Sequence, residues 1–406
     1  MKNILSLLAV LVLILSCSND PGSTGDLLLI GKVSFDNPKA FFIHSSPENE
    51  YESELNYIDQ DNQPQRVIYY DEAGNQLDSL PQSNNYGTEA EGVYLYPLSE
   101  DYFILKVGWD YYLVDKQDGS AHFIQSFLDL FEKGISNSYR DFENLDRYHM
   151  NSADNFYFRG DNISRLNIDN LSDISVKQLS PSMDSVYKST VSDDGLIMYD
   201  SPSVSKLIHQ DGYLIYMENS YSYMWKNTEG DIQYFDSDND RIVTIIQDES
   251  QNISYTNAAF SSFLNLDTVF HTQSYTILIT QNDDIIRVFY DGSSTLLTLP
   301  LNSSINCVEA GTQYVYISLT LEDGSSSFIR LRPSTDSFIT LSNADEYKIM
   351  NLKLMDGGGL LFKGIRNSDD EIVTGTINED GSVELFTLSY PDYAYRFLGV
   401  NNGDEF

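Results

Sequence analysis

The stretch Val315-Tyr316-Ile317-Ser318-Leu319-Thr320-Leu321 places apolar side chains at its odd positions and polar or amphipathic ones at its even positions. A period of two is the pattern of a β-strand with one face more buried than the other. This stretch belongs to a unit from Ser304 to Leu341, in which short apolar runs alternate with polar turns. In this unit we expect strands near 305–308, 314–321, 327–331 and 338–341.

A second unit of the same kind runs from Tyr347 to Phe386. Turns that contain Gly or Asx suit tight hairpins, because these residues adopt positive φ at little cost. Gly292 and Asp336 are 44 residues apart, and Asp336 and Gly381 are 45 apart. In the second unit we expect strands near 349–354, 359–364, 371–377 and 383–386.

Turns with Gly or Asx recur along the chain, at 71–74, 115–119, 170–173, 227–230, 291–292, 332–336 and 378–381. A period of about 40 to 50 residues that carries four strands is typical of a propeller blade. The spacing therefore predicts an all-β fold, with residues 27–406 forming a single β-propeller of four-stranded blades. We expect seven blades, with eight as the alternative; the region from Asp173 to Asp291 holds either insertions or one further blade. Two stacked β-sandwiches would not explain the equal spacing.

The segment from Ser126 to Gly134 departs from the β pattern. Phe127, Leu130 and Phe131 recur at helical spacing, Ser126 suits a helix N-cap, and Gly134 suits a terminator. The sequence therefore predicts a short inserted helix near 126–134, which either packs over a blade edge or serves as a docking element.

A ring of blades must join its first and last segments by strand pairing, which also hides their edges. Two apolar runs suit this task, at residues 27–33 and 394–400. We expect residues 27–33 to form a strand beside the final blade.

The first residues have the pattern of a secretory signal. Lys2 precedes an apolar run from Ile4 to Leu15, which is too short to span a bilayer as a helix. The segment Ile14-Leu15-Ser16-Cys17 resembles the lipobox of bacterial lipoproteins, and this resemblance implies that Cys17 is lipidated and becomes the first residue of the mature chain. An ordinary signal peptide with an incidental cysteine is the alternative.

The lipobox resemblance makes residues 1–16 a signal peptide and residues 17–26 a flexible tether. It implies a bacterial cell envelope location, and Ser18 rather than Asp after the cysteine favours the outer membrane. The chain as a whole resembles β-propeller lipoproteins in general, a resemblance that transfers no binding residue. We expect a monomer that meets the membrane through Cys17 only.

The charge balance excludes several classes of partner. The chain has 24 Lys and Arg against 61 Asp and Glu, a formal net charge of -37. Such a chain repels the phosphate backbone of nucleic acids and an anionic lipid surface. Neither argument applies to neutral sugars, peptides, cations or basic proteins, so an envelope protein or a glycan remains as a partner.

The sequence has no Gly-x-Gly-x-x-Gly, phosphate-binding loop, Gly-x-Ser-x-Gly or His-Glu-x-x-His motif, and its five histidines are scattered. We therefore predict no cofactor and no catalytic residue. Cys307 has no histidine nearby in the sequence, so we expect it to be a small buried apolar residue.

Two weak binding candidates stand out. Asp236, Asp238 and Asp240 alternate as calcium ligands do, but Arg241 and Gln247 replace the Gly and Glu of an EF-hand loop, so we favour a solvated hairpin turn. The other candidate is a set of aromatic side chains that could stack on sugars or peptides, although we favour packing between blades for them: Trp109, Tyr111, Tyr112, Tyr223 and Trp225.

The sequence thus predicts a non-enzymatic, lipid-anchored binding or scaffold module for a protein or a glycan. The alternative is an extracytoplasmic glycan-active hydrolase or lyase with carboxylates in the propeller funnel. Two carboxylates about 5 to 9.5 Å apart in one cleft would favour the enzyme, and fold alone does not decide between the two.

Overall fold

The computed structural model describes part of the chain, namely residues 29–46, 49–77, 93–97, 102–107, 110–126, 155–159, 163–167, 175–178, 188–191, 196–200, 205–208, 214–216, 223–236, 239–247, 253–260, 266–272, 274–300, 303–388, 391 and 394–399. Within these residues the strands form seven four-stranded sheets, one three-stranded sheet and one two-stranded sheet. All their strand pairs are antiparallel.

The seven four-stranded sheets consist, in strand order, of β33 (Ala394–Gly399), β2 (Ala40–Ser46), β3 (Asn49–Ile58) and β4 (Pro64–Arg66); β6 (Val93–Pro97), β7 (Tyr102–Val107), β8 (Asp110–Asp115) and β9 (Ala121–Ser126); β13 (Lys188–Val191), β14 (Ile197–Asp200), β15 (Ser205–Ile208) and β16 (Leu214–Tyr216); β17 (Met224–Lys226), β18 (Ile232–Asp236), β19 (Arg241–Gln247) and β20 (Ile253–Ala259); β21 (Leu266–His271), β22 (Thr276–Thr280), β23 (Ile285–Val288) and β24 (Ser294–Leu297); β25 (Ser303–Ala310), β26 (Val315–Leu321), β27 (Ser326–Arg332) and β28 (Ser337–Thr340); and β29 (Tyr347–Leu354), β30 (Leu360–Arg366), β31 (Ile372–Ile377) and β32 (Val383–Leu385). The three-stranded sheet contains β10 (Asn155–Arg159), β11 (Ile163–Asn167) and β12 (Ser175–Gln178), and the two-stranded sheet pairs β1 (Ile30–Ser34) with β5 (Ile68–Asp71). A single 3₁₀ turn, η3 (Ala344–Glu346), precedes β29.

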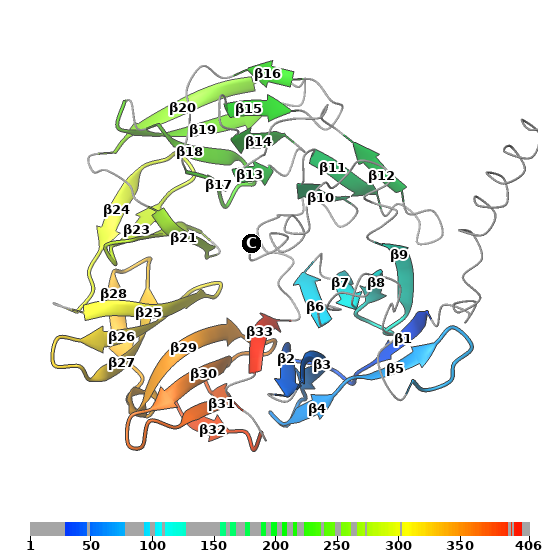
Figure 1. Ribbon diagram of the computed structural model, residues 1–406. Helices are drawn as coiled ribbons and strands as arrows, with labels where there is room; N and C mark the ends of the chain where they lie inside the picture. The colour runs from blue at the N-terminus through cyan, green and yellow to red at the C-terminus, as the bar shows by residue number, and fades with distance from the viewer. Residues whose placement is uncertain are drawn as a thin grey trace, which may run out of the picture.

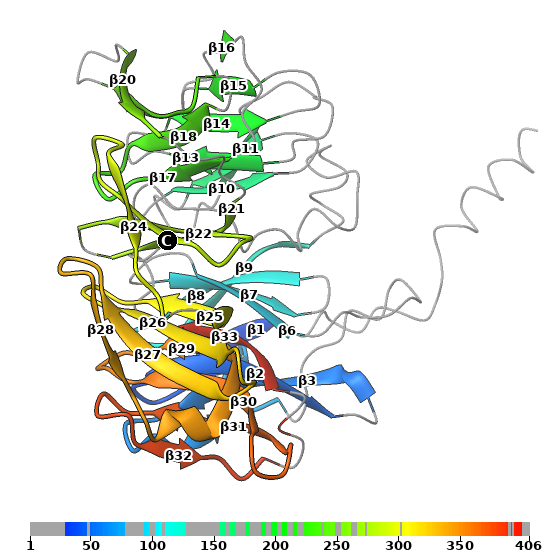
Figure 2. The same ribbon diagram turned by 90° about the vertical axis from the view of Figure 1, so that its left-hand side faces the viewer.

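The sheets are arranged around a common centre, as the blades of a propeller are (Figure 1; Figure 2 shows the ring from the side). Contacts between β25 and β29, β29 and β33, and β33 and β6 join the first strands of successive blades. The predicted all-β propeller of four-stranded blades is confirmed, with seven such blades. The three-stranded sheet lies in the ring between β6–β9 and β13–β16, so the ring holds eight sheets, the number kept as the alternative.

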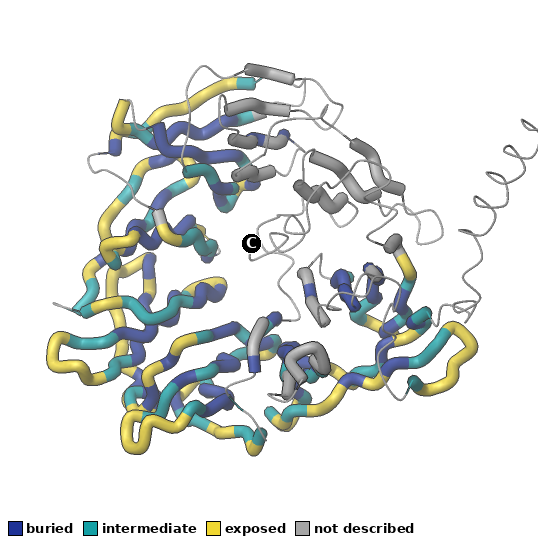
Figure 3. Tube along the Cα trace, viewed as in Figure 1, coloured by how far each residue is buried: buried dark blue, intermediate teal, exposed yellow. Residues whose placement is uncertain are grey.

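The two units read from the sequence fold as two complete blades, β25–β28 and β29–β32. In the first, β26 is buried over its first five residues, the innermost strand β25 is mostly half-buried, and the outermost strand β28 is exposed throughout, so burial is greatest in the middle of the blade (Figure 3). Each blade therefore packs its middle strands against neighbouring blades, which explains why their apolar runs are nearly continuous.

Ring closure takes place within one blade, where the last strand β33 pairs with β2. In their register Phe41 lies opposite Leu398, and Ile43 lies opposite Tyr395. The run at 394–400 therefore has the predicted role in closure. The prediction that residues 27–33 pair with the final blade is wrong, because β1 pairs with β5 instead.

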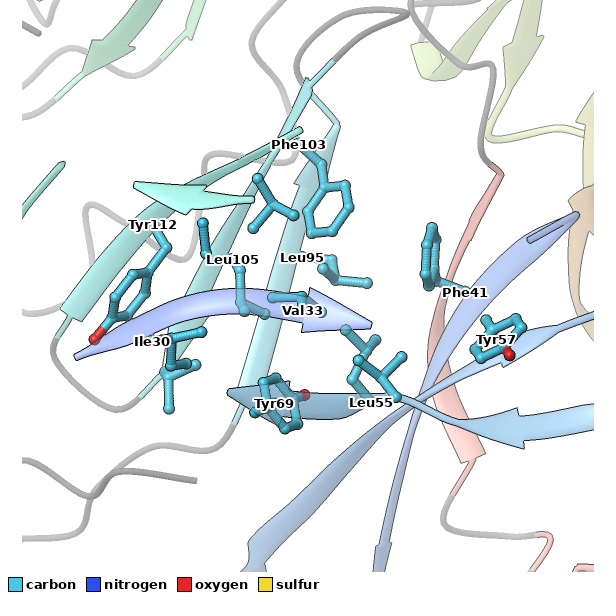
Figure 4. Close-up of a cluster of buried hydrophobic side chains, with 14 of the residues drawn as sticks. Ile30, Val33, Phe41, Leu55, Tyr57, Tyr69, Leu95, Phe103, Leu105 and Tyr112 are labelled. Atoms are coloured by element: carbon cyan, nitrogen blue, oxygen red, sulfur yellow. The ribbon is translucent and has the colours of Figure 1, made fainter. Parts of the chain in front are cut away.

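The two-stranded sheet β1–β5 joins the closing blade to the next one. The Val33 amide donates a hydrogen bond of 2.7 Å to the carbonyl of Gly119, in the turn between β8 and β9. Ile30 and Val33 are buried in an apolar cluster with side chains of both blades, among them Phe41 and Phe103 (Figure 4). The apolar side chains of β1 are therefore covered between the closing blade and the next one, while its backbone pairs with β5.

The predicted helix near 126–134 is not part of the described fold. Ser126 is the last residue of β9, and residues 127–134 lie outside the described residues.

Four hairpin turns share the sequence Asp-Gly-Ser, at 118–120, 291–293, 323–325 and 380–382. In the last three turns the Asp carboxylate accepts hydrogen bonds from the Ser hydroxyl at 2.6 Å and from the Ser amide at 2.9 Å. These bonds lower the pKa of Asp291, Asp323 and Asp380 below the usual value.

We predict that Gly119→Ala lowers the melting temperature. Gly119 has φ +73°, and a Cβ atom there would lie 1.9 Å from the Val33 carbonyl oxygen, so β1 must move away from the turn. Gly324→Ala is the matched control, because Gly324 has φ +83° with open space around it. Thermal unfolding by circular dichroism should show a larger loss for Gly119→Ala; equal losses would mean that backbone strain alone is responsible.

We predict that the Asp-Gly-Ser turns make stability depend on acid. A carboxyl group whose pKa is lowered on folding contributes stability above its unfolded pKa, about 3.9, and loses it as the pH falls through the folded value. The melting temperature should therefore fall from pH 5 to pH 3, and Asp323→Asn should reduce that fall. Asp61→Asn removes an exposed carboxylate from a different type of turn and serves as the control. A fall in Asp323→Asn as large as in the parent would contradict the prediction.

Candidate functional site

The aromatic candidates pack inside the blades. Tyr111 and Tyr112 on β8 are buried, and the Tyr112 ring meets the ring of Phe123 edge to face at 5.7 Å. Trp225 on β17 is also buried, where its Nε1 donates a hydrogen bond of 2.9 Å to Gln233 Oε1. These contacts give the side chains a role in packing.

The remaining aromatic candidates differ in what the structure describes. Tyr223 is half-buried and packs against the apolar cluster that contains Trp225. Trp109 lies outside the described residues.

The acidic triplet lies at the hairpin between β18 and β19. Asp236 is buried and accepts hydrogen bonds from Arg241 Nε at 2.8 Å and from Asn239 Nδ2 at 2.9 Å. Asp240 is exposed with φ +46°, a turn conformation, and Asp238 lies outside the described residues. Within the described part of the chain, no group of three His, Cys, Asp or Glu side chains is placed to hold a metal ion.

The structure describes one of the two cysteines. Cys17 lies outside the described residues. Cys307 on β25 is largely enclosed, its thiol lies 3.5 Å from the Ile349 carbonyl of the next blade, and burial raises the pKa of this thiol to about 12. Such a thiol is a poor nucleophile at neutral pH. Among the described residues no helix is long and apolar enough to cross a membrane.

A buried carboxylate does lie on a first strand of the ring. Glu309 on β25 forms an ion pair of 2.9 Å with Lys353 on β29 and accepts the Leu354 amide at 3.1 Å. Both partners belong to the neighbouring blade, so this carboxylate joins two blades. The partners of this carboxylate are thus a cation and a backbone amide.

The arginines divide into two groups. Six of them have described side chains, and three of these form ion pairs: Arg66 with Glu54 at 3.1 Å, Arg241 with Asp236 at 2.8 Å, and Arg366 with Asp369 at 2.9 Å and Glu371 at 3.0 Å. The other three have no carboxylate partner among the described residues and lie against aromatic rings instead: Arg287, Arg330 and Arg332.

Arg287 on β23 is held between two aromatic rings. Its Cζ lies 5.2 Å from the ring centre of Tyr275 and 5.1 Å from that of Phe289, and these two rings meet edge to face at 5.3 Å. Its Nη1 donates a hydrogen bond to the carbonyl of Pro333 in the next blade. Cation–π contacts and this bond together fix the guanidinium.

Arg330 on β27 repeats the arrangement one blade further on. Its Cζ lies 4.6 Å from the ring centre of Tyr314, and its Nη1 donates a hydrogen bond of 3.4 Å to the Glu379 carbonyl of the following blade. The exposed Arg332 approaches the same ring, with its Cζ 5.8 Å from the centre.

Strand register shows that the two half-buried arginines are equivalent. Arg287 pairs with Ile277, and Arg330 pairs with Tyr316, which are the second residues of β22 and β26. A tyrosine directly precedes each of these strands. We call the resulting set the arginine belt, and its members are Tyr275, Arg287, Phe289, Tyr314, Arg330 and Arg332.

At the joint between the β17–β20 blade and the β21–β24 blade, neutral side chains take the position that Arg287 and Arg330 occupy in the next two blades. Thr244 on β19 and Gln233 on β18 donate hydrogen bonds to the carbonyl of Tyr290 at 3.3 and 3.0 Å. Tyr290 lies in the β23–β24 turn, as Pro333 and Glu379 lie in the corresponding turns of the next two blades. Arginine is therefore not required to bridge blades, and the belt places cations where neutral side chains also serve.

Sequence reasoning missed the arginine belt. Its arginines are separated by one blade in the sequence, and the belt forms only through strand register.

Comparisons with known proteins do not assign this chain to a family. No family model and no curated protein matches this chain. Among solved structures, a putative 6-phosphogluconolactonase from Bacteroides uniformis is 12% identical with a TM-score of 0.42, covering 89% of this chain and 99% of that one. Virginiamycin B lyase from Staphylococcus aureus in complex with quinupristin is 14% identical with a TM-score of 0.36, covering 58% and 81%. The WD40 domain of SCAP from fission yeast is 9% identical with a TM-score of 0.38, covering 56% and 61%. These similarities give no function to this chain.

Proposed function

We propose that this chain is a lipid-anchored β-propeller of the bacterial cell envelope, on the outer membrane, that acts as a non-enzymatic binding or scaffold module for a protein or a glycan. The proposal of an anchor rests on the segment Ile14-Leu15-Ser16-Cys17, which places a cysteine at the end of an apolar run. Two or three acyl chains on Cys17 would hold the domain stably, because each buried methylene contributes about 0.8 kcal/mol.

The observation that carries the binding role is the arginine belt. In a chain with 61 acidic residues, three guanidinium groups are left without a carboxylate partner among the described residues. Each is held in place by an aromatic ring, which lowers the entropy that a ligand contact costs. Fixed cations beside aromatic rings suit recognition of a partner.

We predict that Cys17→Ala releases the protein from the membrane or leaves an unprocessed precursor. Without the thiol no acyl chain is attached, so the proposed lipid anchor is lost. Membrane fractionation and detergent phase partitioning measure this. Ser18→Ala is the control and should partition as the parent does. Unchanged processing and partitioning of Cys17→Ala would refute the anchor.

We predict that a partner crosslinks at the belt in intact cells. A photoreactive phenylalanine in place of Tyr290, whose side chain is 60% exposed next to Phe289, should capture the partner. The control position is Phe123 on β9, an exposed aromatic residue across the ring (Figure 1). Identification of the captured species then decides between protein and glycan. Equal capture at both positions, or capture at neither, would contradict binding at the belt.

A further inference from the structure

We propose that the arginine belt binds the carboxylate groups of an acidic glycan, a chain built from uronic acid residues. This inference rests on the proposed binding function and names its ligand class.

The belt retains donors that a carboxylate can use. A guanidinium carries five N–H donors. Arg287 and Arg330 each use Nη1 for a backbone carbonyl, and the Nε of each is buried without an acceptor. Arg330 also hydrogen-bonds the Tyr316 side chain, so Nη2 of Arg287 is the donor left for a ligand at these two arginines. The guanidinium of Arg332 is exposed and makes neither a hydrogen bond nor an ion pair with a described residue. Planar guanidinium groups prefer carboxylate partners in a two-bond geometry.

The placement of the cations fits a polymer. Arg287 and Arg330 occupy equivalent positions in neighbouring blades, so these two blades present a positive charge at the same place. Arg332 directly precedes Pro333, whose carbonyl holds Arg287, so these two arginines lie at the same joint between blades. A chain that carries one carboxylate on each repeating unit can meet several of these cations, and such multiple contacts add avidity.

The aromatic rings favour a sugar over an acidic peptide. Tyr275, Phe289 and Tyr314 are half-buried. A uronic acid carries its carboxylate as a substituent of the sugar ring, so one residue can place the C–H face of the ring against an aromatic side chain and pair its carboxylate with the adjacent arginine.

The overall charge does not prevent this contact. At physiological ionic strength charges are screened over about 8 Å, so the groups near the belt decide the local attraction. Acidic groups do lie close: Asp336 is in the same turn as Pro333, and the Glu379 carboxylate is beside Gly358. Burial raises the pKa of Tyr316, and the charge of Glu379 adds to that rise. A glycan with one charge per sugar is repelled less than a nucleic acid with its denser phosphates.

The test is titration calorimetry of the full-length chain in detergent with polygalacturonate, with its fully methyl-esterified form, and with poly-glutamate. We expect binding to polygalacturonate and at least tenfold weaker binding to the esterified form, which has the same sugar without the charge. Arg332→Gln should weaken binding about tenfold, the effect of losing one charge-assisted contact. Because Arg332 is exposed, the melting temperature of the Arg332→Gln variant should equal that of the parent.

Arg66→Gln is the control, because Arg66 is an exposed arginine paired with Glu54 in another blade. It should bind as the parent does. Equal affinity for the charged and esterified polymers, unchanged affinity of Arg332→Gln, or tighter binding of poly-glutamate would each overturn the uronate proposal. If one of these results overturns the uronate proposal but a partner is still captured at the belt in cells, the proposed binding function stands. If there is neither capture in cells nor glycan binding, both the binding function and the uronate proposal fail.

Discussion

The antiparallel pairing of β33 with β2 is the interaction on which the ring depends. A closed ring of sheets has no free first or last blade, and this pairing is the one place where the two ends of the described fold meet within a sheet. Leu398 enters the same apolar cluster as Phe41, so closing the sheet and filling the core are one event. The remaining blades are joined by side chains that reach across to a neighbouring carbonyl, such as Arg287 and Arg330.

Much of the fold follows from local sequence patterns. The wrong expectations arise because a local pattern marks a strand or a turn without showing its place in the fold. The strands between 303 and 386 agree with the expected ranges because their apolar runs are bounded by turns with positive φ, as at Gly324 and Gly381. A glycine marks a hairpin but not which hairpin of a blade it closes. Gly119 lies between the third and fourth strands of its blade, whereas Gly74 follows β5 outside the blades. Gly74 and Gly119 are 45 residues apart, but this distance does not measure the length of a blade, because the two turns are not equivalent.

The candidate site was less predictable than the fold because it depends on long-range register. The burial of Tyr112 and Trp225 agrees with the preference for packing, since strand alternation alone places such rings between blades. The pairing of Arg287 with Ile277 and of Arg330 with Tyr316 is what makes two distant arginines equivalent. Nor does a sequence reveal which arginines lack a carboxylate, because that depends on neighbours brought in by folding.

The closing blade combines three early strands with the last described strand, so it is completed late in synthesis. Its strands β2, β3 and β4 are synthesised before the strands of the other blades, and β33 is synthesised after all the other described strands. Until then Phe41 and Ile43, which are fully covered in the finished ring, lack the strand that pairs beside them. The growing chain therefore carries an unfinished sheet edge until β33 has been made. A premature stop anywhere before Ala394 leaves that edge open, which makes truncated products targets for aggregation and proteolysis.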